Sequence, residues 1–201
     1  HQLHRRQRQM CIRDSVKHVK GDEAEGRHDA VFSFTGKSGK NWDITIEDDH
    51  LVDLILKTNR LGAKDADLFM YISEAGNEVD LKAEHINQYI RDSSGMGFTA
   101  KNFRTWAATS RCAERLAFLS SQRTASEMKT WLKSIPSVES MDKLWTSGDW
   151  KVPATDAGRN KAMLAVIDTV AADLGNTRAV CRSSYIHPWF LDAWADGRLG
   201  Q

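Results

Sequence analysis

The chain has 201 residues, a formal net charge of +1, and 41% hydrophobic against 27% charged residues. This composition allows one sizeable core and excludes a fibrous or wholly disordered chain. No stretch approaches the roughly 18 apolar residues that span a bilayer. The near-neutral charge counts mildly against nucleic-acid binding, but a local basic site remains compatible with it. We expect no membrane span and a cytoplasmic protein.

The three cysteines, Cys11, Cys112 and Cys181, lie far apart and show neither disulfide-framework nor zinc-site spacing. No His, Cys, Asp or Glu grouping has metal-ligand spacing. We therefore expect neither a metal nor another cofactor.

The first fifteen residues differ from the rest, because residues 1–8 form a basic run without periodicity. We expect residues 1–15 to be a non-native leader and residues 16–201 to form one domain that lacks its N-terminal part. Two strands follow, over residues 30–35 and 41–46, joined by Gly36-Lys37-Ser38-Gly39-Lys40. A short connection with two glycines predicts an antiparallel β-hairpin.

The remaining pattern is mostly helical. Helices are predicted over about residues 49–60, 81–91, 125–134 and 158–174, with a buried strand at 68–72 and a loop or short helix at 137–157. Thr99 predicts the N-cap of a long helix. Its core face is predicted to contain Phe103, Trp106, Ala107, Ala113, Leu116 and Ala117. The fold class is therefore α+β, mainly α.

A C-terminal block, residues 175–188, places a tyrosine among side chains that bind phosphate. Gly175 can cap the preceding helix, and Asn176, Thr177, Arg178 and Arg182 supply amide, hydroxyl and guanidinium donors before Tyr185. A phenol can attack a phosphodiester when nearby positive charge favours its anion. Tyr71 and Tyr89 lack such neighbours, so they are read as ordinary packing residues.

Two further cations fit the same chemistry. Arg104 lies on the first turns of the helix that begins after Thr99, where its planar fork suits a phosphate. Lys37 lies at the tip of the hairpin, where it can reach into a nucleic-acid groove. The ordinary alternatives are a surface arginine, an exposed turn lysine and, for Asn176, a capping residue.

Three sequence segments occur in one order: residues 34–40, residues 98–107 and residues 174–188. Together they resemble the catalytic domain of bacterial, poxvirus-like type IB DNA topoisomerases. This resemblance covers about residues 16–201. It implies the multi-helical catalytic core shared by tyrosine recombinases and type IB topoisomerases, with a small N-terminal β-hairpin.

The resemblance also implies an activity. Such an enzyme nicks one strand of duplex DNA, permits rotation and reseals it without ATP or metal. We expect a monomer that is associated with the nucleoid. Tyr185 would form a 3′-phosphotyrosyl bond, Arg104 and Asn176 would hold the phosphate, and Lys37 would protonate the leaving 5′ oxygen. Lys40, Lys101, Arg178 and Arg182 would contact DNA.

The chain departs from the family pattern at several positions. A second catalytic arginine upstream of the hairpin is not recognisable, and Arg178, Ser183 and Ala108 replace a usual proline, lysine and glycine. We therefore expect weak or no relaxation activity from these residues alone. Two alternatives stay open: a tyrosine recombinase, whose usual His-x-x-Arg word is missing around Arg104, and a non-catalytic DNA-binding module.

Overall fold

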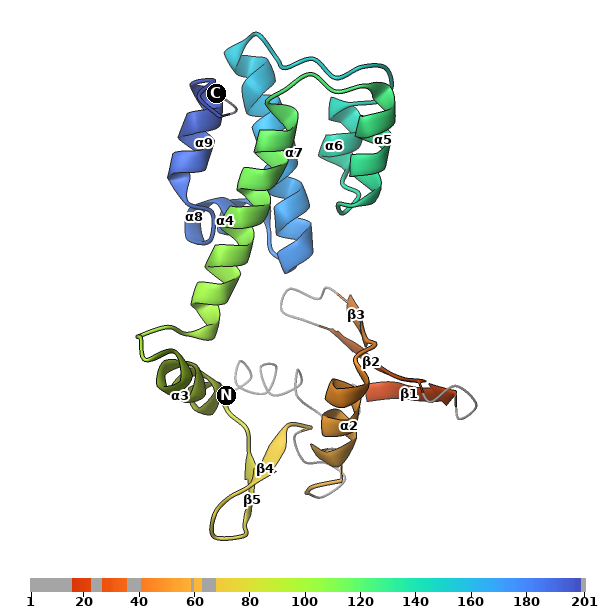
Figure 1. The fold of residues 1–201 in the computed structure, drawn as a ribbon, viewed down its shortest axis with the longest axis vertical. Helices are drawn as coiled ribbons and strands as arrows, with labels where there is room; N and C mark the ends of the chain where they lie inside the picture. The colour runs from red at the N-terminus through yellow and green to blue at the C-terminus, as the bar shows by residue number, and fades with distance from the viewer. Residues whose placement is uncertain (1–15, 23–26, 36–40, 59, 63–67, 200–201) are drawn as a thin grey trace. The chain divides into compact units, whose positions relative to one another are not determined.

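The computed structural model describes residues 16–22, 27–35, 41–58, 60–62 and 68–199 (Figure 1). The chain divides into two compact units, residues 1–86 and 87–201, and the boundary falls within helix α3, Ala83–Ser94. Each unit is described by itself below.

The first unit begins with a three-stranded antiparallel sheet. Its strands are β1, Val16–Asp22, β2, Arg27–Thr35, and β3, Asn41–Ile46, in the order β1-β2-β3. Strands β2 and β3 pair from Ala30 opposite Ile46 to Thr35 opposite Asn41. The predicted hairpin is thus confirmed, whereas β1 was not expected, because its polar sequence lacks a regular alternation of apolar residues.

Helix α2, Asp49–Thr58, covers this sheet. Its buried Val52 and Ile55 pack with Ala30 of β2 in a small hydrophobic cluster. Strands β4, Met70–Ile72, and β5, Glu78–Asp80, form a second antiparallel pair. The predicted strand at 68–72 is therefore shorter than expected.

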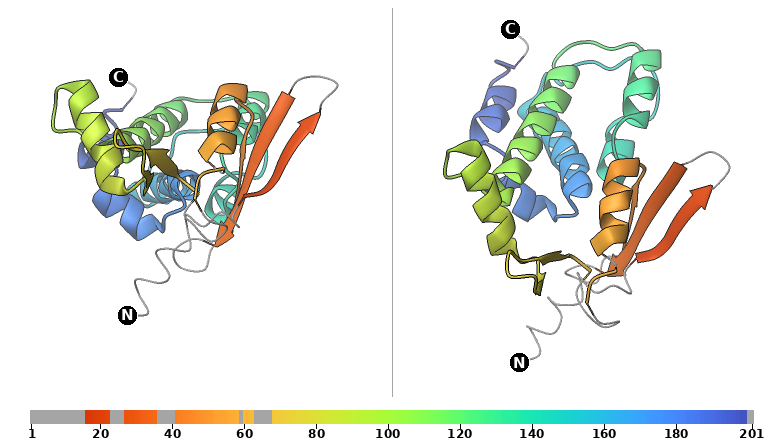
Figure 2. Two further views of the ribbon diagram at one scale, coloured as in Figure 1. Left: turned by 90° about the horizontal axis from the view of Figure 1, so that it is seen from below. Right: turned by 60° about the horizontal axis from the view of Figure 1, so that its bottom comes forward.

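The second unit consists of helices among the residues described. After α3 come α4, Ala100–Leu119, α5, Ala125–Lys133, α6, Glu139–Leu144, α7, Asp156–Leu174, α8, Arg178–Ser184, and α9, Pro188–Ala195. Helix α7 contacts α4, α6, α8 and α9, and α4 runs alongside it (Figures 1 and 2). The mainly helical α+β class is confirmed.

The predicted core face of α4 is partly wrong. Leu116 is buried, but Phe103 and Trp106 are 59% and 71% exposed. The buried positions are instead Ala108, Cys112, Arg115, Leu116 and Leu119. These positions follow the helical repeat, and the small Ala108 and Cys112 side chains permit close packing on the other helices. The aromatic residues therefore lie on the opposite, solvent-facing side of α4.

Among the described residues, no helix is both long and apolar enough to cross a membrane.

Candidate active site

The first part of the site is the turn that ends α7. Gly175 adopts a left-handed conformation with φ of 64°, which glycine tolerates without steric cost. Its amide donates to the Ala172 carbonyl at 3.2 Å, and the Asn176 amide donates to the Ala171 carbonyl at 2.8 Å. This pair of bonds is a Schellman motif. The helix end predicted at Gly175 is confirmed, and the backbone of Asn176 is fixed directly after it.

The Asn176 side chain carries an unused donor. Its Nδ2 atom is buried and has no hydrogen-bond partner among the residues that the structure describes. A buried amide that lacks a partner costs about 1–3 kcal/mol. A bound acceptor such as a phosphate oxygen would remove that cost.

Helix α8 leads from this turn to Tyr185. Thr177 caps α8 by accepting a hydrogen bond from the Val180 amide at 3.3 Å. Tyr185 follows the last helical residue, and its amide donates to the Cys181 carbonyl at 3.2 Å. Its side chain is half-buried and packs against the main hydrophobic core. Pro188 then begins α9 at its first position, so the tyrosine lies in a short link between two helices.

Arg104 joins the two parts of the site. Its Nη2 donates to the Leu174 carbonyl at 2.9 Å, and its Cζ lies 5.5 Å from the centre of the Tyr185 ring. This distance falls within the range of cation–π contacts. The structure therefore brings Arg104, Tyr185 and the turn bearing Asn176 together, although Arg104 and Tyr185 are far apart in sequence.

A further side chain of α4 contacts the link that holds Tyr185. The Thr109 hydroxyl donates to the Tyr185 carbonyl at 3.0 Å and accepts from the His187 amide at 3.1 Å. The sequence analysis missed this residue. No local pattern marks it, because the contact joins segments more than 70 residues apart.

Arg178 has a partner within its own unit. Its Nε donates to Asp168 Oδ1 at 2.6 Å, its Nη2 contacts Asp168 Oδ2, and the Ser140 hydroxyl donates to the same carboxylate at 2.5 Å. The bonds from Arg178 are the main reason that the pKa of Asp168 lies below its ordinary value. The DNA contact predicted for Arg178 stays a prediction, and such a contact would compete with this ion pair.

The other predicted cations differ in what the structure says of them. Lys101 and Arg182 are exposed, on the first turn of α4 and the last turn of α8. Lys37 and Lys40 lie outside the described residues, between β2 and β3.

Two buried thiols lie on the helices that carry the site. Burial is the main cause that raises the pKa of Cys112, on α4, to about 12 and that of Cys181, on α8, to about 11. Both thiols stay protonated near neutral pH, so neither offers a thiolate that could compete with the tyrosine.

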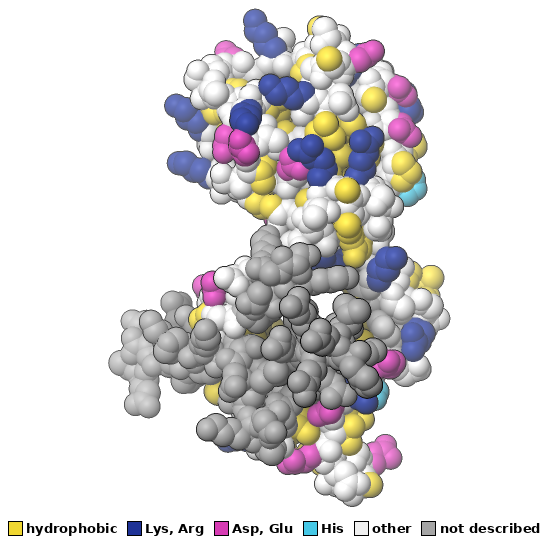
Figure 3. Space-filling model, turned by 180° about the vertical axis from the view of Figure 1, so that it is seen from behind, with side chains coloured by type: hydrophobic (Ala, Val, Ile, Leu, Met, Phe, Trp, Pro, Cys, Tyr) yellow, Lys and Arg dark blue, Asp and Glu magenta, His cyan; other side chains and the backbone are white. Residues whose placement is uncertain are grey.

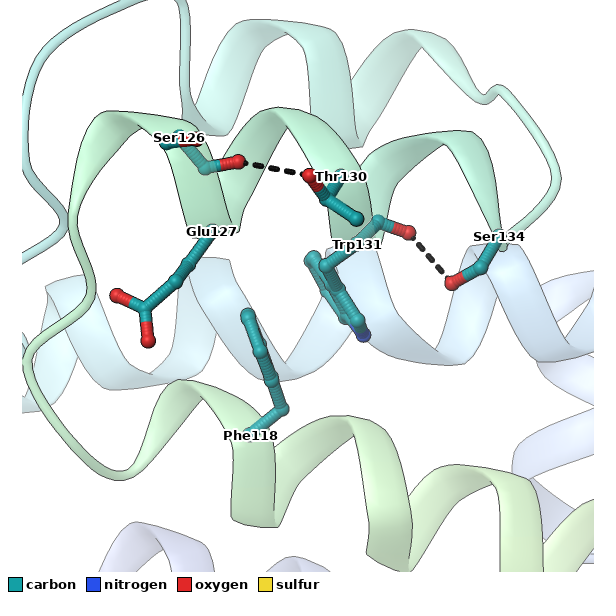
Figure 4. A pocket seen from close by; sticks show the side chains of 6 residues that line it. All are labelled: Phe118, Ser126, Glu127, Thr130, Trp131 and Ser134. Carbon is teal, nitrogen blue, oxygen red and sulfur yellow. Dashed lines mark hydrogen bonds between the residues drawn. The ribbon is translucent and has the colours of Figure 1, made fainter.

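A groove elsewhere in the helical unit contains none of the predicted catalytic residues. It lies between α4 and α5, where Phe118 and Trp131 stack with ring centres 4.6 Å apart (Figure 4). In the part of the chain that the structure describes, no group of His, Cys, Asp or Glu side chains could hold a metal ion.

Comparison with known proteins gives the family. The family described as "Eukaryotic DNA topoisomerase I, catalytic core" matches residues 11–188. The chain belongs to this family. The matched range spans the positions of Lys37, Arg104, Asn176 and Tyr185.

A curated relative points in the same direction. The chain is 36% identical over 109 residues to a protein named DNA topoisomerase 1B from Acanthamoeba polyphaga mimivirus. The aligned region is 52% of this chain and 32% of that protein. The chain thus spans about a third of the length of the relative it matches.

Proposed function

We propose that this chain carries the catalytic core of a type IB DNA topoisomerase, which relaxes duplex DNA by transient cleavage and religation of one strand. The proposal rests on one observation: Arg104 contacts the Tyr185 ring and donates a hydrogen bond to Leu174, in the turn that precedes Asn176. This arrangement combines a nucleophile, a cation and an unpartnered amide donor. Membership of the topoisomerase I family supports the same chemistry.

The proposed reaction conserves the number of phosphoester bonds. The Tyr185 oxygen bonds to the scissile phosphorus as the bond to the 5′ oxygen breaks, which leaves a 3′-phosphotyrosyl enzyme and a 5′-hydroxyl. Strand rotation follows, and attack by the 5′-hydroxyl reverses the step. Because the covalent intermediate retains the bond energy, the chemistry requires neither ATP nor metal.

Arg104 and Asn176 would stabilise the charge of the transition state. Arg104 has five N–H donors, and the bond to Leu174 is its one hydrogen bond to the residues described. Its remaining donors suit two non-bridging oxygens, and Asn176 Nδ2 suits one. Loss of one such donor typically slows catalysis by about 10²–10³-fold.

Lys37 is proposed as the acid that protonates the leaving 5′ oxygen. Lys40, Lys101 and Arg182 are proposed to contact the DNA backbone, and Arg178 is proposed to contact it more weakly, because Arg178 pairs with Asp168. The second catalytic arginine stays unassigned. The sequence segments around Lys37, Arg104 and Tyr185 favour the bacterial, poxvirus-like branch. We also propose that the protein acts as a cytoplasmic, nucleoid-associated monomer.

The test is covalent capture on a nicked duplex whose cleaved product dissociates, so that religation is prevented. The scissile strand carries a label at its 5′ end in one substrate and at its 3′ end in another. We expect a protein adduct on a denaturing gel with the 5′ label alone, from the unsubstituted chain and from the control Tyr89→Phe. Tyr89 is 72% exposed on α3.

Tyr185→Phe should abolish the adduct, because it removes the attacking oxygen and leaves the ring. An adduct that survives this substitution would identify a different nucleophile. An adduct with the 3′ label would contradict the proposed polarity of cleavage. No adduct from the unsubstituted chain would favour a non-catalytic DNA-binding module.

A further inference from the structure

We infer that Thr109 is a positioning residue for Tyr185, an inference that rests on the proposed function. Its hydroxyl contacts the backbone on both sides of the link, at the Tyr185 carbonyl and the His187 amide. The single hydroxyl proton goes to the carbonyl, and an oxygen lone pair receives the amide hydrogen. One side chain thus satisfies two main-chain groups across the link between α8 and α9.

These two main-chain groups need a partner from outside their own helices. Carbonyls at the end of a helix and amides at the start of the next have no intrahelical partners. The Tyr185 carbonyl is at the end of α8, and the His187 amide precedes α9. Thr109 supplies both bonds, and Ile186 between them is buried. The link is therefore fixed from two directions.

The acceptor of the Thr109 hydroxyl differs from the acceptors of two other threonine hydroxyls in helices. In α4 the Thr105 hydroxyl donates to the Lys101 carbonyl at 3.1 Å, and in α5 the Thr130 hydroxyl donates to the Ser126 carbonyl at 3.0 Å. Such bonds to the preceding turn are common for threonine in helices. Thr109 instead donates to Tyr185, outside its own helix.

The contact also couples the nucleophile to the phosphate-binding arginine. Arg104 and Thr109 both belong to α4, and they contact the side chain and the backbone of Tyr185 respectively. A rigid helix therefore fixes the spacing between the two groups that must meet at one phosphorus. A misplacement of about 1 Å can cost roughly 10²-fold in rate.

The test compares Thr109→Val, which keeps the branched shape, with Thr109→Ser, which keeps the hydroxyl. Thr130→Val is the matched control, because it removes a helix-internal hydroxyl bond remote from the link. Three quantities are measured on the whole chain: hydrogen exchange at residues 185–187, the Kd for duplex DNA, and the single-turnover cleavage rate at saturating DNA.

For Thr109→Val we expect roughly tenfold faster hydrogen exchange at the His187 amide, because this amide loses the hydroxyl that accepts its hydrogen bond. Exchange in α5 should stay unchanged. Cleavage should slow by about 10–100-fold while Kd stays within about twofold, since the defect is one of positioning. Thr109→Ser and Thr130→Val should remain within about threefold of the unsubstituted chain in rate. A normal rate in Thr109→Ser would show that the hydroxyl, and not the packing of the methyl group, is responsible for the effect.

Unchanged exchange in Thr109→Val, or unchanged cleavage at saturating DNA, would overturn the inference. So would a cleavage defect that higher DNA concentration removes. If the unsubstituted chain forms no adduct, the proposed function fails, and hydrogen exchange still decides whether Thr109 holds the link. Faster exchange in the valine variant that serine restores supports the positioning contact, and the absence of that pattern refutes it.

Discussion

Arg104 occupies an unusual position for an exposed side chain, because two separate contacts orient it. The Leu174 carbonyl accepts one of its hydrogen bonds, and the Tyr185 ring lies against its guanidinium. A lysine could keep the charge but not the planar fork. Because Arg104 is already oriented, binding of a phosphate would cost less side-chain conformational entropy.

Lys37 offers a residue-scale prediction about proton transfer. Lys37→Ala should slow cleavage of an ordinary duplex by about 10²–10⁴-fold, because the 5′ oxygen then leaves without a general acid. If the 5′ bridging oxygen is replaced by sulfur, the same variant should cleave within about tenfold of the unsubstituted chain, because a thiolate leaves without needing that proton. Single-turnover cleavage of both duplexes measures this difference.

Arg104→Ala is the matched control for this prediction. It removes a donor to the non-bridging oxygens, so sulfur at the bridging position should not restore its rate. Equal defects of Lys37→Ala on the two substrates would show that Lys37 binds DNA instead of donating the proton.

At the scale of single residues, the sequence suggested candidate site residues but not the contacts that they make. Tyr185, Arg104 and Asn176 were recognisable because each supplies a particular chemistry, and the structure places Arg104 at both Tyr185 and the turn of Asn176. The partners Thr109 and Asp168 were not recognisable. Their roles depend on which helices pack together, and no neighbouring residue carries that information.

The turn at Gly175 gives a prediction at the scale of an element. Gly175→Ala should cost about 1–2 kcal/mol of stability, because an added Cβ disfavours the left-handed backbone. It should also lower the cleavage rate, since this turn carries the Leu174 carbonyl and Asn176. Urea unfolding and single-turnover cleavage measure the two effects.

Two other glycines provide controls. Gly95 has φ of 63°, and a methyl group there would meet open space, so Gly95→Ala should cost similar stability but leave cleavage unchanged. Gly97 also has open space and no positive φ, so Gly97→Ala should change stability by no more than about 1 kcal/mol. A cleavage defect in Gly95→Ala as large as in Gly175→Ala would show that the turn has no special effect on the site.

Many of the elements were predictable, but strands β1 and β5 and helices α8 and α9 were not. The N-cap at Thr99 is confirmed by hydrogen bonds from its amide and hydroxyl to Asn102 Oδ1, at 2.9 and 2.8 Å. The core face of α4 was misjudged because Phe103 and Trp106 were assumed to be buried. Size and hydrophobicity alone do not reveal which side of a helix its neighbours cover.

At the scale of the whole molecule, the net charge of +1 implies that the proposed binding of DNA would depend on a few local cations. On the face of the helical unit in Figure 3, Lys and Arg side chains are interspersed with acidic and hydrophobic ones. We expect Arg182→Ala to reduce the slope of log K against log salt by about 1, the effect of losing one phosphate contact. Arg178→Ala should reduce it by less than about half as much, because Asp168 already pairs with Arg178.

Titration of a labelled duplex at several KCl concentrations measures these slopes. Asp168→Asn is the control, because it frees Arg178 and should steepen the slope. Equal reductions for Arg178→Ala and Arg182→Ala would show that Arg178 leaves Asp168 to bind DNA.

The sequence analysis did not address a division into two compact units, which the structure shows at residue 86. The sequence around residue 86 gives no sign of a boundary, because α3 continues through it. A helix can join two groups of contacts without the glycine, proline or polar runs that commonly mark a linker.

The anchor of Arg104 has a consequence for how the site tolerates mutation. Its acceptor at position 174 is a main-chain carbonyl, which every amino acid supplies. The Leu174 side chain packs against the hydrophobic core, so packing restricts the choice to apolar residues, while the anchoring oxygen itself persists through such exchanges. Substitution of the side chain at position 174 therefore leaves the acceptor for Arg104 in place. The orientation of Arg104 depends instead on the path of the backbone at this position.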